Sequence, residues 1–356
     1  MLDLDNTTKA LKGKRIMITG GAGSIGSELV RQMIKFDPAQ IIIVDQAETP
    51  LVEIDLEIKE AFGYSNAVAV IADIVDVYRI DSVFKKFKPQ VVFHAAAYKH
   101  VPIMEAYPRE AVNVNIQGTK NLAELANTYG CEKFVMVSTD KAVNPTNVMG
   151  ASKRIAEMFV QSLNKYSKTQ YITTRFGNVL GSNGSVIPRF KKQIAKGGPI
   201  TVTDPEITRY FMTIPEAAQL VLEAGAMGQG GEIFLFDMGE PVKILHVAEK
   251  IIRLSGLQPY EDIDIIFTGL RPGEKLYEEL LTTKENCIET HHPKITIAKV
   301  HELEFELISS KISDLIMELS DFNNAHNLVR KMKDIVPDFI SQNSEFAKID
   351  KETAAV

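Results

Sequence analysis

Residues 15–26 read RIMITGGAGSIG, and this stretch decides the fold. The apolar run over 15–19 has the length of a buried strand, and apolar residues at helical spacing follow from 27 to about 35. Glycine suits a tight turn whose backbone approaches a pyrophosphate closely, and the next helix offers free N–H groups to phosphates. The turn carries three glycines at the spacing G-x-x-G-x-x-G, namely Gly20, Gly23 and Gly26. A strand, a phosphate-binding turn and a helix are therefore predicted.

A second apolar run over residues 41–44 ends in Asp45, about 20 residues beyond the glycines. At that position a carboxylate accepts hydrogen bonds from the adenosine ribose hydroxyls. The same negative charge would repel a 2′-phosphate. A dinucleotide site that prefers NAD to NADP is therefore expected.

The alternation of strands and helices continues through the first half of the chain. Strands are expected over 67–72, 91–94 and 134–138, with a helix over 112–129. This order predicts an α/β fold, a Rossmann-type doubly wound parallel sheet. His94 is expected to be a structural histidine, and Asn115 a packing or backbone-bridging group. The predicted cofactor-binding residues lie at strand ends and on the glycine turn: Gly20, Gly23, Ser24, Ile25, Gly26, Asp45, Asp73, Ile74, Ala95, Ala96, Ala97, Lys153 and Val179.

Residues 138–153, STDKAVNPTNVMGASK, join the fifth predicted strand to a helix. Ligands of open α/β sheets bind outside the carboxyl ends of the strands, where this stretch must lie. The pair Asp140 and Lys141, with Lys153 further on, is therefore a candidate reaction centre. A polar loop followed by a helix-starting lysine is the other interpretation.

After residue 177 the chain becomes rich in Gly, Pro and polar loops, as expected where a substrate is enclosed. The planar guanidinium groups of Arg189, Arg209 and Arg271 suit a diphosphate, although a surface salt bridge explains each one equally well. Lys99 follows the fourth strand and faces the expected ligand. We predict a Rossmann domain over 10–177, a smaller mixed α/β substrate lobe over 178–300 and a helical C-terminal segment over 301–356.

Composition narrows the class of protein. The net charge is −6 with no basic block, which argues against nucleic acid as a partner. Cys131 and Cys287 are too few for a disulfide framework or a metal site, so a reducing, cytoplasmic location is expected. No apolar run reaches the roughly 20 residues needed to cross a bilayer. The chain itself is expected to make no membrane contact, and its abrupt start fits either the cytoplasmic domain of a membrane-anchored parent or a short natural N-terminus.

These motifs together resemble the extended short-chain dehydrogenase/reductases. More narrowly, the segment 138–145 (STDKAVNP) resembles the UDP-N-acetylglucosamine 4,6-dehydratases of bacterial polysaccharide and glycan biosynthesis, including lipopolysaccharide and capsule. The segment 271–275 (RPGEK) matches one that binds the UDP portion in that family. The resemblance runs from about residue 10 to 300. Met149 stands where these enzymes usually place a tyrosine, as in one subgroup that mainly retains configuration at C5.

The resemblance implies an NAD-dependent 4,6-dehydration by a homo-oligomer without a metal. Asp140 is expected to be the acid toward O6, Lys141 the base at C5 and Thr139 a hydrogen-bond donor to the C4 oxygen. Met149 replaces the usual proton-transferring tyrosine, and Lys153 holds the nicotinamide ribose. Because an ordinary lysine has a pKa of about 10.4, this assignment is easiest with Asp140 protonated and Lys141 neutral. The predicted substrate-binding residues are Lys99, Asn178, Arg189, Arg209, Arg271 and Glu274.

Three alternatives remain open at this point. A UDP-hexose 4-epimerase needs the same cofactor, but it has no use for Asp140 and Lys141 and relies on the tyrosine that Met149 replaces. A C5-inverting dehydratase differs only in the face of the intermediate on which C5 is reprotonated. A non-catalytic NAD-binding regulator would explain why Met149 replaces the tyrosine. It would not explain why Asp140, Lys141 and Lys153 are present.

Overall fold

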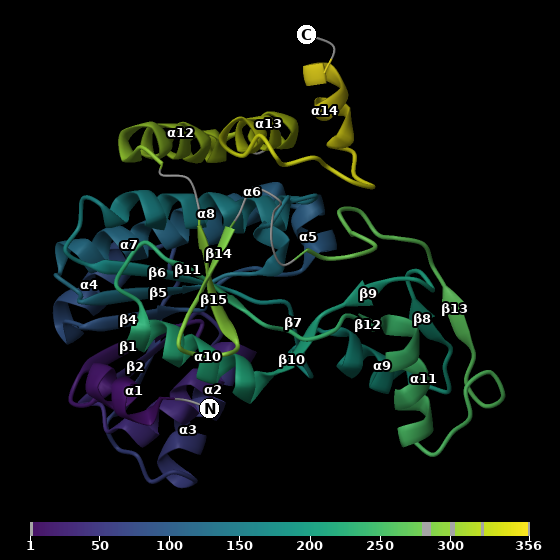
Figure 1. Cartoon of the computed structure of the whole chain (residues 1–356), viewed down its shortest axis with the longest axis horizontal. Coiled ribbons are helices and arrows are strands. Elements are labelled where there is room, and N and C mark those ends of the chain that lie inside the picture. The colour runs from purple at the N-terminus through teal and green to yellow at the C-terminus, as the bar shows by residue number, and fades with distance from the viewer. Residues whose placement is uncertain (1–2, 280–285, 300–302, 322–323, 355–356) are drawn as a thin grey trace.

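A nine-stranded sheet runs through the larger part of the molecule (Figure 1), with the strand order β14-β15-β11-β6-β5-β4-β1-β2-β3. The structure is a computed structural model that describes residues 3–279, 286–299, 303–321 and 324–354. The strands from β3 to β11 pair in parallel, whereas β15 is antiparallel to β11 and β14 to β15. The nine strands are β1 (Arg15–Thr19), β2 (Gln40–Asp45), β3 (Ala67–Ile71), β4 (Val91–His94), β5 (Lys133–Val137), β6 (Gln170–Arg175), β11 (Ile233–Phe236), β14 (Asn286–Glu289) and β15 (Ile295–Lys299).

The order of the strands reverses between β1 and β4. The chain leaves β1 toward β2 and β3 on one side, and then returns to place β4 on the other side of β1. Such a reversal opens a crevice outside the carboxyl ends of the two central strands. The five predicted strands of the first half are confirmed, and with them the doubly wound fold.

Helices cover both faces of the sheet, and each face has its own apolar cluster. One face carries α4 (Val77–Phe87), α5 (Val101–Ala106), α6 (Pro108–Glu110), η2 (Ala111–Gly118), α7 (Thr119–Thr128) and α8 (Val148–Asn164). The other carries α1 (Leu4–Leu11), α2 (Ser24–Met33), η1 (Ile34–Phe36), α3 (Glu48–Glu60) and α10 (Ile214–Met227). The helix predicted over 112–129 is confirmed, although its first part, η2, is a π-helix.

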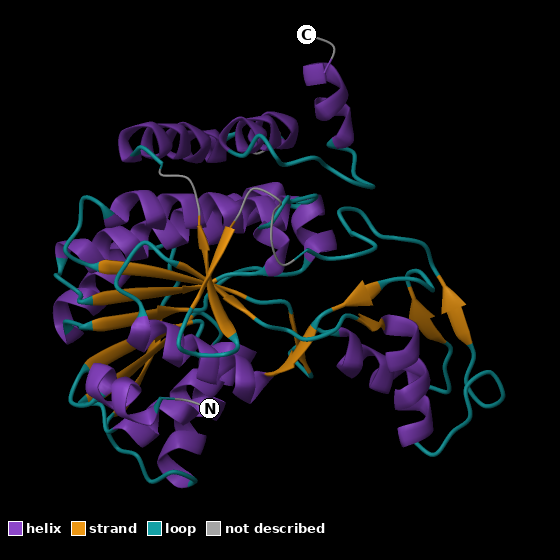
Figure 2. Cartoon of the chain, viewed as in Figure 1, coloured by secondary structure: helices purple, strands orange, loops and turns teal. Residues whose placement is uncertain are grey.

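A smaller mixed α/β lobe stands beside the sheet (Figure 2). Its apolar cluster includes Phe190, Ile200 and Ile252. Its elements are α9 (Val186–Ile194), α11 (Ile244–Leu254), β8 (Ile200–Val202) paired with β13 (Ile265–Phe267), and β9 (Thr208–Arg209) paired with β12 (Val242–Lys243). The pair β7 (Asn178–Leu180) and β10 (Phe211–Thr213) connects the two parts.

The two lobes interleave along the chain. After the first passage into the small lobe, α10 and β11 return to the large sheet, and β14 and β15 return after the second. The range 178–300, predicted to be mainly the substrate lobe, thus also contains α10 and the strands β11, β14 and β15 of the large sheet, because periodicity does not tell which sheet a strand joins. The division predicted at 300–301 lies outside the described residues.

The C-terminal segment adds a further layer of helices. In Figure 1, α12 (Phe305–Met317) and α13 (Ala325–Ile335) lie over α8, with η4 (Glu318–Ser320) between them. Ile312, Leu315 and Val329 are buried in the same apolar cluster as α8. The last helix, α14 (Ala347–Ala354), is joined to α13 by the ion pairs Lys333–Asp350 and Arg330–Glu352. Across the described ranges, no helix has both the length and the apolar character to cross a membrane.

A buried ion pair holds α8 against the ends of β5 and β6. The guanidinium of Arg175 donates to Glu157 from Nε at 3.0 Å and from a terminal nitrogen at 2.8 Å, and both side chains are almost fully buried. Ser138 Oγ donates to the same carboxylate at 2.6 Å. A two-pronged contact of this kind fixes direction as well as distance. The Glu157 carboxylate thus fixes Ser138, where the stretch 138–153 begins, and α8, in which it ends.

The ion pair gives a stability prediction. Arg175→Met leaves the Glu157 carboxylate buried without its main counter-charge, and it should lower the free energy of unfolding by about 3–5 kcal/mol. The double substitution with Glu157→Leu should recover most of that loss. Arg154→Met is the control, because Arg154 reaches Glu157 at 3.3 Å from a partly exposed position, and it should cost under about 1 kcal/mol. Urea denaturation measures all of these variants, and equal effects of Arg175→Met and Arg154→Met would contradict the account.

Candidate active site

A pocket lies outside the carboxyl ends of β1 to β4. Most of the predicted cofactor residues line it: Gly20, Gly23, Asp45, Asp73, Ile74, Ala95, Ala96 and Ala97. Gln46, Tyr98 and Val114 are among the lining residues that the sequence did not single out. Ser24, Ile25, Gly26, Lys153 and Val179 are not part of this lining. The adenosine half of a dinucleotide fits such a crevice in position and chemistry.

The glycine turn is built so that only glycine fits. Gly20 has a left-handed φ of +66°, and a Cβ there would lie 2.6 Å from the nitrogen of Ala96 on the floor of the pocket. A Cβ on Gly26 would lie 2.0 Å from the oxygen of Gly20. Gly26 therefore lets α2 close on the turn, so its role is packing.

Asp45 is held at the rim of the pocket by backbone donors. One carboxylate oxygen accepts from the N–H of Ala22 at 3.0 Å, and the other accepts from the N–H of Ala47 at 2.9 Å. Each oxygen keeps further lone-pair capacity for ribose hydroxyls. The fixed negative charge beside the glycine turn fits a dinucleotide without a 2′-phosphate.

The reaction-centre residues follow β5 on a short turn, η3 (Asp140–Ala142). The Asp140 side chain is fully buried, and its Oδ1 accepts from Lys141 Nζ at 2.9 Å and from the Thr139 hydroxyl at 2.9 Å. Thr139 also caps the turn by accepting from the N–H of Lys141 at 3.4 Å. Its predicted contact with a sugar oxygen stays a prediction.

Glu278 is the functional residue that the sequence did not reveal. Its Oε1 lies 3.3 Å from Lys141 Nζ and 3.6 Å from Arg209 Nε, and 3% of its side chain is exposed. Asn178 Oδ1 also accepts from Lys141 at 3.3 Å. Glu278 and Glu279 are adjacent in the sequence, and no local pattern separates them. Only the fold shows that Glu278 points inward while Glu279 is exposed.

The two carboxylates decide the charge of Lys141. Burial alone favours the neutral amine, but Asp140 and Glu278 outweigh it and raise the pKa of Lys141. A neutral Lys141, the condition under which the catalytic assignment is easiest, is therefore disfavoured in the protein without substrate, because Glu278 adds to the effect of Asp140. Within the described residues, Asp140 Oδ2 and Glu278 Oε2 are buried and accept no hydrogen bond. Two acceptor oxygens beside one cation are thus left for a bound molecule.

Met149 and Lys153 lie one turn apart on α8, on the same face of the helix. Met149 is buried in the apolar cluster, so the position of the usual tyrosine carries no proton-transferring group. Burial lowers the pKa of Lys153 to about 8, against the opposing effect of Glu157. Below that pH, Lys153 is a buried cation, as required of a group that holds ribose oxygens.

Two predicted structural residues are confirmed. His94 is fully buried between the hydroxyls of Thr19, at 2.8 Å, and Thr119, at 2.9 Å. Burial keeps its pKa well below the ordinary value for histidine, so the ring is neutral. Asn115 bridges the backbone N–H and C=O of Tyr98.

Among the predicted substrate residues, the structure brings Asn178 and Arg209 to Lys141. Arg209 is buried and donates to the carbonyls of Thr208, Lys275 and Leu276. The remaining four make other contacts: Arg271 pairs with Glu274 at 2.6 Å, Arg189 donates to Thr201, and Lys99 Nζ lies 3.5 Å from Ser182 Oγ.

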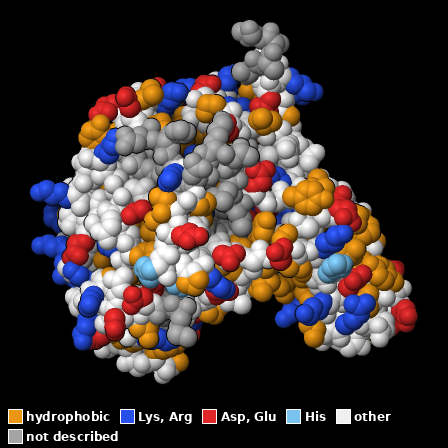
Figure 3. Space-filling view, in the orientation of Figure 1, with side chains coloured by type: hydrophobic (Ala, Val, Ile, Leu, Met, Phe, Trp, Pro, Cys, Tyr) orange, Lys and Arg blue, Asp and Glu red, His pale blue; other side chains and the backbone are white. Residues whose placement is uncertain are grey.

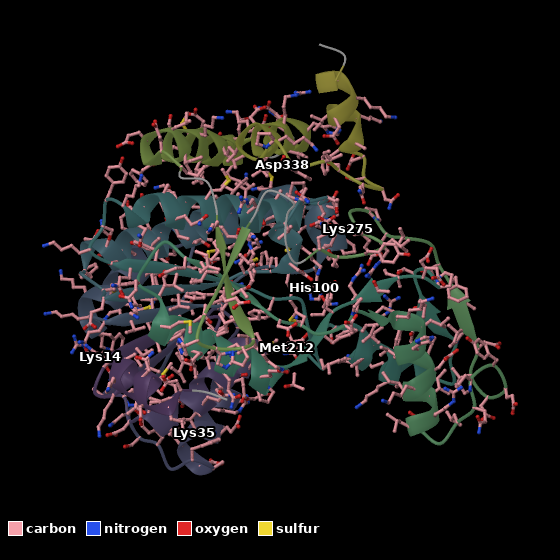
Figure 4. All side chains as sticks on the ribbon, viewed as in Figure 1. Lys14, Lys35, His100, Met212, Lys275 and Asp338 are labelled. Carbon is pink, nitrogen blue, oxygen red and sulfur yellow. The ribbon has the colours of Figure 1, made fainter. Side chains whose placement is uncertain are left out.

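The residues around Lys141 come from segments of both lobes, since Asp140 follows β5 and Glu278 follows the small-lobe strand β13. His100 and Lys275, labelled in Figure 4, mark the junction of the two lobes, and the space-filling view shows a hollow between the lobes on the visible face (Figure 3). His100 packs closely on Gly184, because a Cβ added to Gly184 would lie 2.6 Å from the His100 ring.

Comparison with known proteins identifies relatives with related chemistry. The family model described as "Polysaccharide biosynthesis protein" matches residues 16–300. The capsular polysaccharide biosynthesis protein CapD of Staphylococcus aureus is 54% identical over 319 residues, covering 89% of this chain and 52% of CapD. The chain thus spans about half the length of CapD.

Two further relatives bear on the reaction. The solved structure of Pen from Bacillus thuringiensis is 32% identical, with a TM-score of 0.75, covering 85% of this chain and 99% of Pen. A protein of Rickettsia bellii named UDP-glucose 4-epimerase is 37% identical over 279 residues, covering 76% of this chain and 79% of the epimerase.

Gly26 gives a binding prediction. Gly26→Ala forces the turn away from α2, because the added methyl group meets the backbone oxygen of Gly20. The affinity for NAD+ should fall at least tenfold, measured by calorimetry. Gly63→Ala is the control: its φ of +61° makes the substitution strained, but the added methyl group meets no atom within 4 Å and Gly63 does not line the pocket, so the affinity should be unchanged. Wild-type affinity in Gly26→Ala would contradict the packing role.

Lys153 gives a pH prediction for the protein without cofactor. The folded chain releases this proton near pH 8, whereas an unfolded lysine holds it to about pH 10.4. The unfolded chain binds more protons between these values, so stability rises with pH across this window. The difference in free energy of unfolding, wild type minus Lys153→Met, should rise by about 3 kcal/mol from below pH 8 to above pH 10. Denaturant titrations at both ends measure it, and a constant difference would count against the depressed pKa.

Proposed function

Because the chain belongs to the polysaccharide biosynthesis protein family, we propose that it is an NAD-dependent 4,6-dehydratase of UDP-N-acetylglucosamine. The product would be a UDP-4-keto-6-deoxy-N-acetylhexosamine with retained configuration at C5, made for a bacterial polysaccharide or glycan. One observation carries the proposal: Lys141 lies between two buried carboxylates, each of which keeps one oxygen with no hydrogen-bond partner among the described residues.

NAD+ would be held by the glycine turn, Asp45, the residues 95–97 and Lys153. When bound, it supplies an acceptor for the hydride from C4 and returns that hydride to C6. This chain's own residues must then handle the protons. Loss of water from a 4-keto sugar needs a base at C5 and an acid at O6, and both must be present in one pocket.

Asp140 and Lys141 can become that pair by moving one proton. Without substrate the lysine is charged, and its proton lies on a 2.9 Å hydrogen bond to Asp140 Oδ1. When the sugar excludes water, the charged pair loses solvation, and transfer of this proton leaves a neutral amine beside a carboxylic acid. The two sites then titrate as one system, which reconciles the raised pKa of Lys141 with a role as base.

The protons balance once the C4 hydroxyl is counted: its proton, released as C4 is oxidised, replaces the one that Asp140 gives to O6. The Lys141 amine takes the proton from C5, Asp140 gives its proton to O6, and water leaves C6. When the hydride returns to C6, the Lys141 ammonium gives its proton back to C5. Donation from the same group, on the same face, retains the configuration. The Glu278 carboxylate lies 3.3 Å from the amine, and a neighbouring anion strengthens Lys141 as a base.

A 4-epimerase is the second candidate, favoured by the R. bellii relative. It would need the same cofactor and the same ketone. It has no use for a buried acid and base beyond the cofactor, and it depends on the tyrosine that Met149 replaces. The buried, apolar surroundings of Met149 and the arrangement around Lys141 therefore favour dehydration.

Mass spectrometry of the product tests the proposal. The chain is incubated with NAD+ and UDP-N-acetylglucosamine, with UDP-glucose as the comparison substrate. The expected product is lighter than the substrate by one water, and proton NMR coupling constants should show retained configuration at C5. A product of unchanged mass would replace the proposal with epimerisation, and an unchanged substrate would refute both.

Two substitutions test the proton assignments. Lys141→Ala should abolish keto-sugar formation while NAD+ still binds, and Glu278→Gln should lower kcat by about 10²-fold or more. Glu279→Gln is the matched control, because this neighbouring glutamate is exposed and pairs with Asn144, and its kcat should stay within about threefold of wild type. Equal kcat values for Glu278→Gln and Glu279→Gln would remove Glu278 from the mechanism.

A further inference from the structure

We propose that the C-terminal strap, residues 339–346, is a positioning element of the active site, with Ser344 as its key side chain. It fixes the active-site loop, residues 143–148, which joins the turn carrying Asp140 and Lys141 to α8. Its effect on turnover rests on the proposed function, whereas its effect on the loop does not. The strap lies outside residues 16–300, the part of the chain that the family model matches.

The strap pairs with the active-site loop through its backbone. The N–H of Ile340 donates to the carbonyl of Pro145 at 3.1 Å, and the N–H of Gln342 donates to that of Thr146 at 3.1 Å. On its other side, the carbonyl of Gln342 accepts from the N–H of Gly273 at 2.8 Å. One residue of the strap thus joins the active-site loop to the segment 271–275.

A side-chain relay links the strap to the start of α8. Ser344 Oγ donates to Glu105 Oε2 at 2.5 Å, and Glu105 Oε1 accepts from the N–H of Val148 at 2.6 Å. Glu105 is buried, so its carboxylate depends on these donors. Val148 is the first residue of α8 and directly precedes Met149, one turn before Lys153. Ser344 therefore orients a carboxylate that anchors the helix of the catalytic lysine.

The active-site loop needs support from outside. Asn144 has a left-handed φ of +39°, an uncommon conformation for a residue with a side chain. Its amide donates to Glu279 at 2.7 Å, and Lys275 Nζ donates to the carbonyl of Val143 at 3.2 Å. Because contacts from outside hold the loop in this conformation, it is expected to shift when one set of them is removed. Asp140 and Lys141 lie just before the loop in the chain.

The strap is itself firmly held. Phe339 and Phe346, at its two ends, are buried in the apolar cluster beneath α12 and α13. Lys333 of α13 donates to the carbonyl of Phe339 at 3.0 Å, to Ser341 Oγ at 2.9 Å and to Asp350 at 2.6 Å. The packing of the C-terminal helices therefore reaches the active site through the strap.

Hydrogen exchange and kinetics of full-length variants test the proposal. Ser344→Ala removes the relay, and Gln342→Pro removes the donor to Thr146. In Ser344→Ala, the amide of Val148 should exchange about tenfold faster, while amides in the middle of α8 keep their rates. In both variants kcat should fall about tenfold, with the Kd for NAD+ unchanged. A simple loss of stability would instead raise exchange throughout α8.

Two controls complete the test. Ser344→Thr keeps the hydroxyl and should restore both the exchange rate and kcat, and Lys348→Ala changes an exposed residue just beyond the strap and should alter neither. Wild-type exchange at Val148 and wild-type kcat in Ser344→Ala would overturn the proposal, even if Gln342→Pro fails to fold. If the wild type makes no keto sugar, the proposed function fails, and the exchange rates alone decide for or against the strap.

Discussion

The contact of Lys141 with Asp140 and Glu278 is the interaction on which the rest of this structure depends. A largely buried cation is stable only beside counter-charges, and a buried carboxylate is stable only beside a cation or donors. Asp140 comes from the end of β5, whereas Glu278 comes from the segment that returns from the small lobe. The ion pairs of Lys141 therefore link the turn after β5 in the large lobe to the segment that returns from the small lobe.

This arrangement also explains how the chain can do without the usual tyrosine. Met149 occupies that position on α8 and is packed among apolar side chains. In the proposed mechanism, proton transfer is left to the turn after β5, where the side chains of Asp140 and Lys141 share a hydrogen bond. Lys153, a turn further along α8, is left to hold the cofactor, and its ion-paired neighbour Glu157 fixes the helix.

The cofactor crevice was predictable because its signals are local. A strand followed by a glycine turn fixes where a phosphate lies, and a strand end fixes where Asp45, Asp73 and Ala95–Ala97 lie. Glu278 was not predictable, because its role depends on a contact 137 positions from Lys141 in the chain, and Glu279 has the same side chain. The second carboxylate that acts on the pKa of Lys141 was missed for the same reason. The return of β11 and β15 to the large sheet depends on pairing, which composition does not encode.

The most direct test of this account is the charge of Lys141 before and after substrate binds. NMR of the side-chain nitrogen, in protein labelled at lysine and assigned with Lys141→Ala, reports whether the group is an ammonium or an amine. The account predicts an ammonium in the NAD-bound protein and a neutral amine once a non-reacting UDP-sugar analogue fills the hollow. An ammonium signal that is unchanged by the analogue would contradict it.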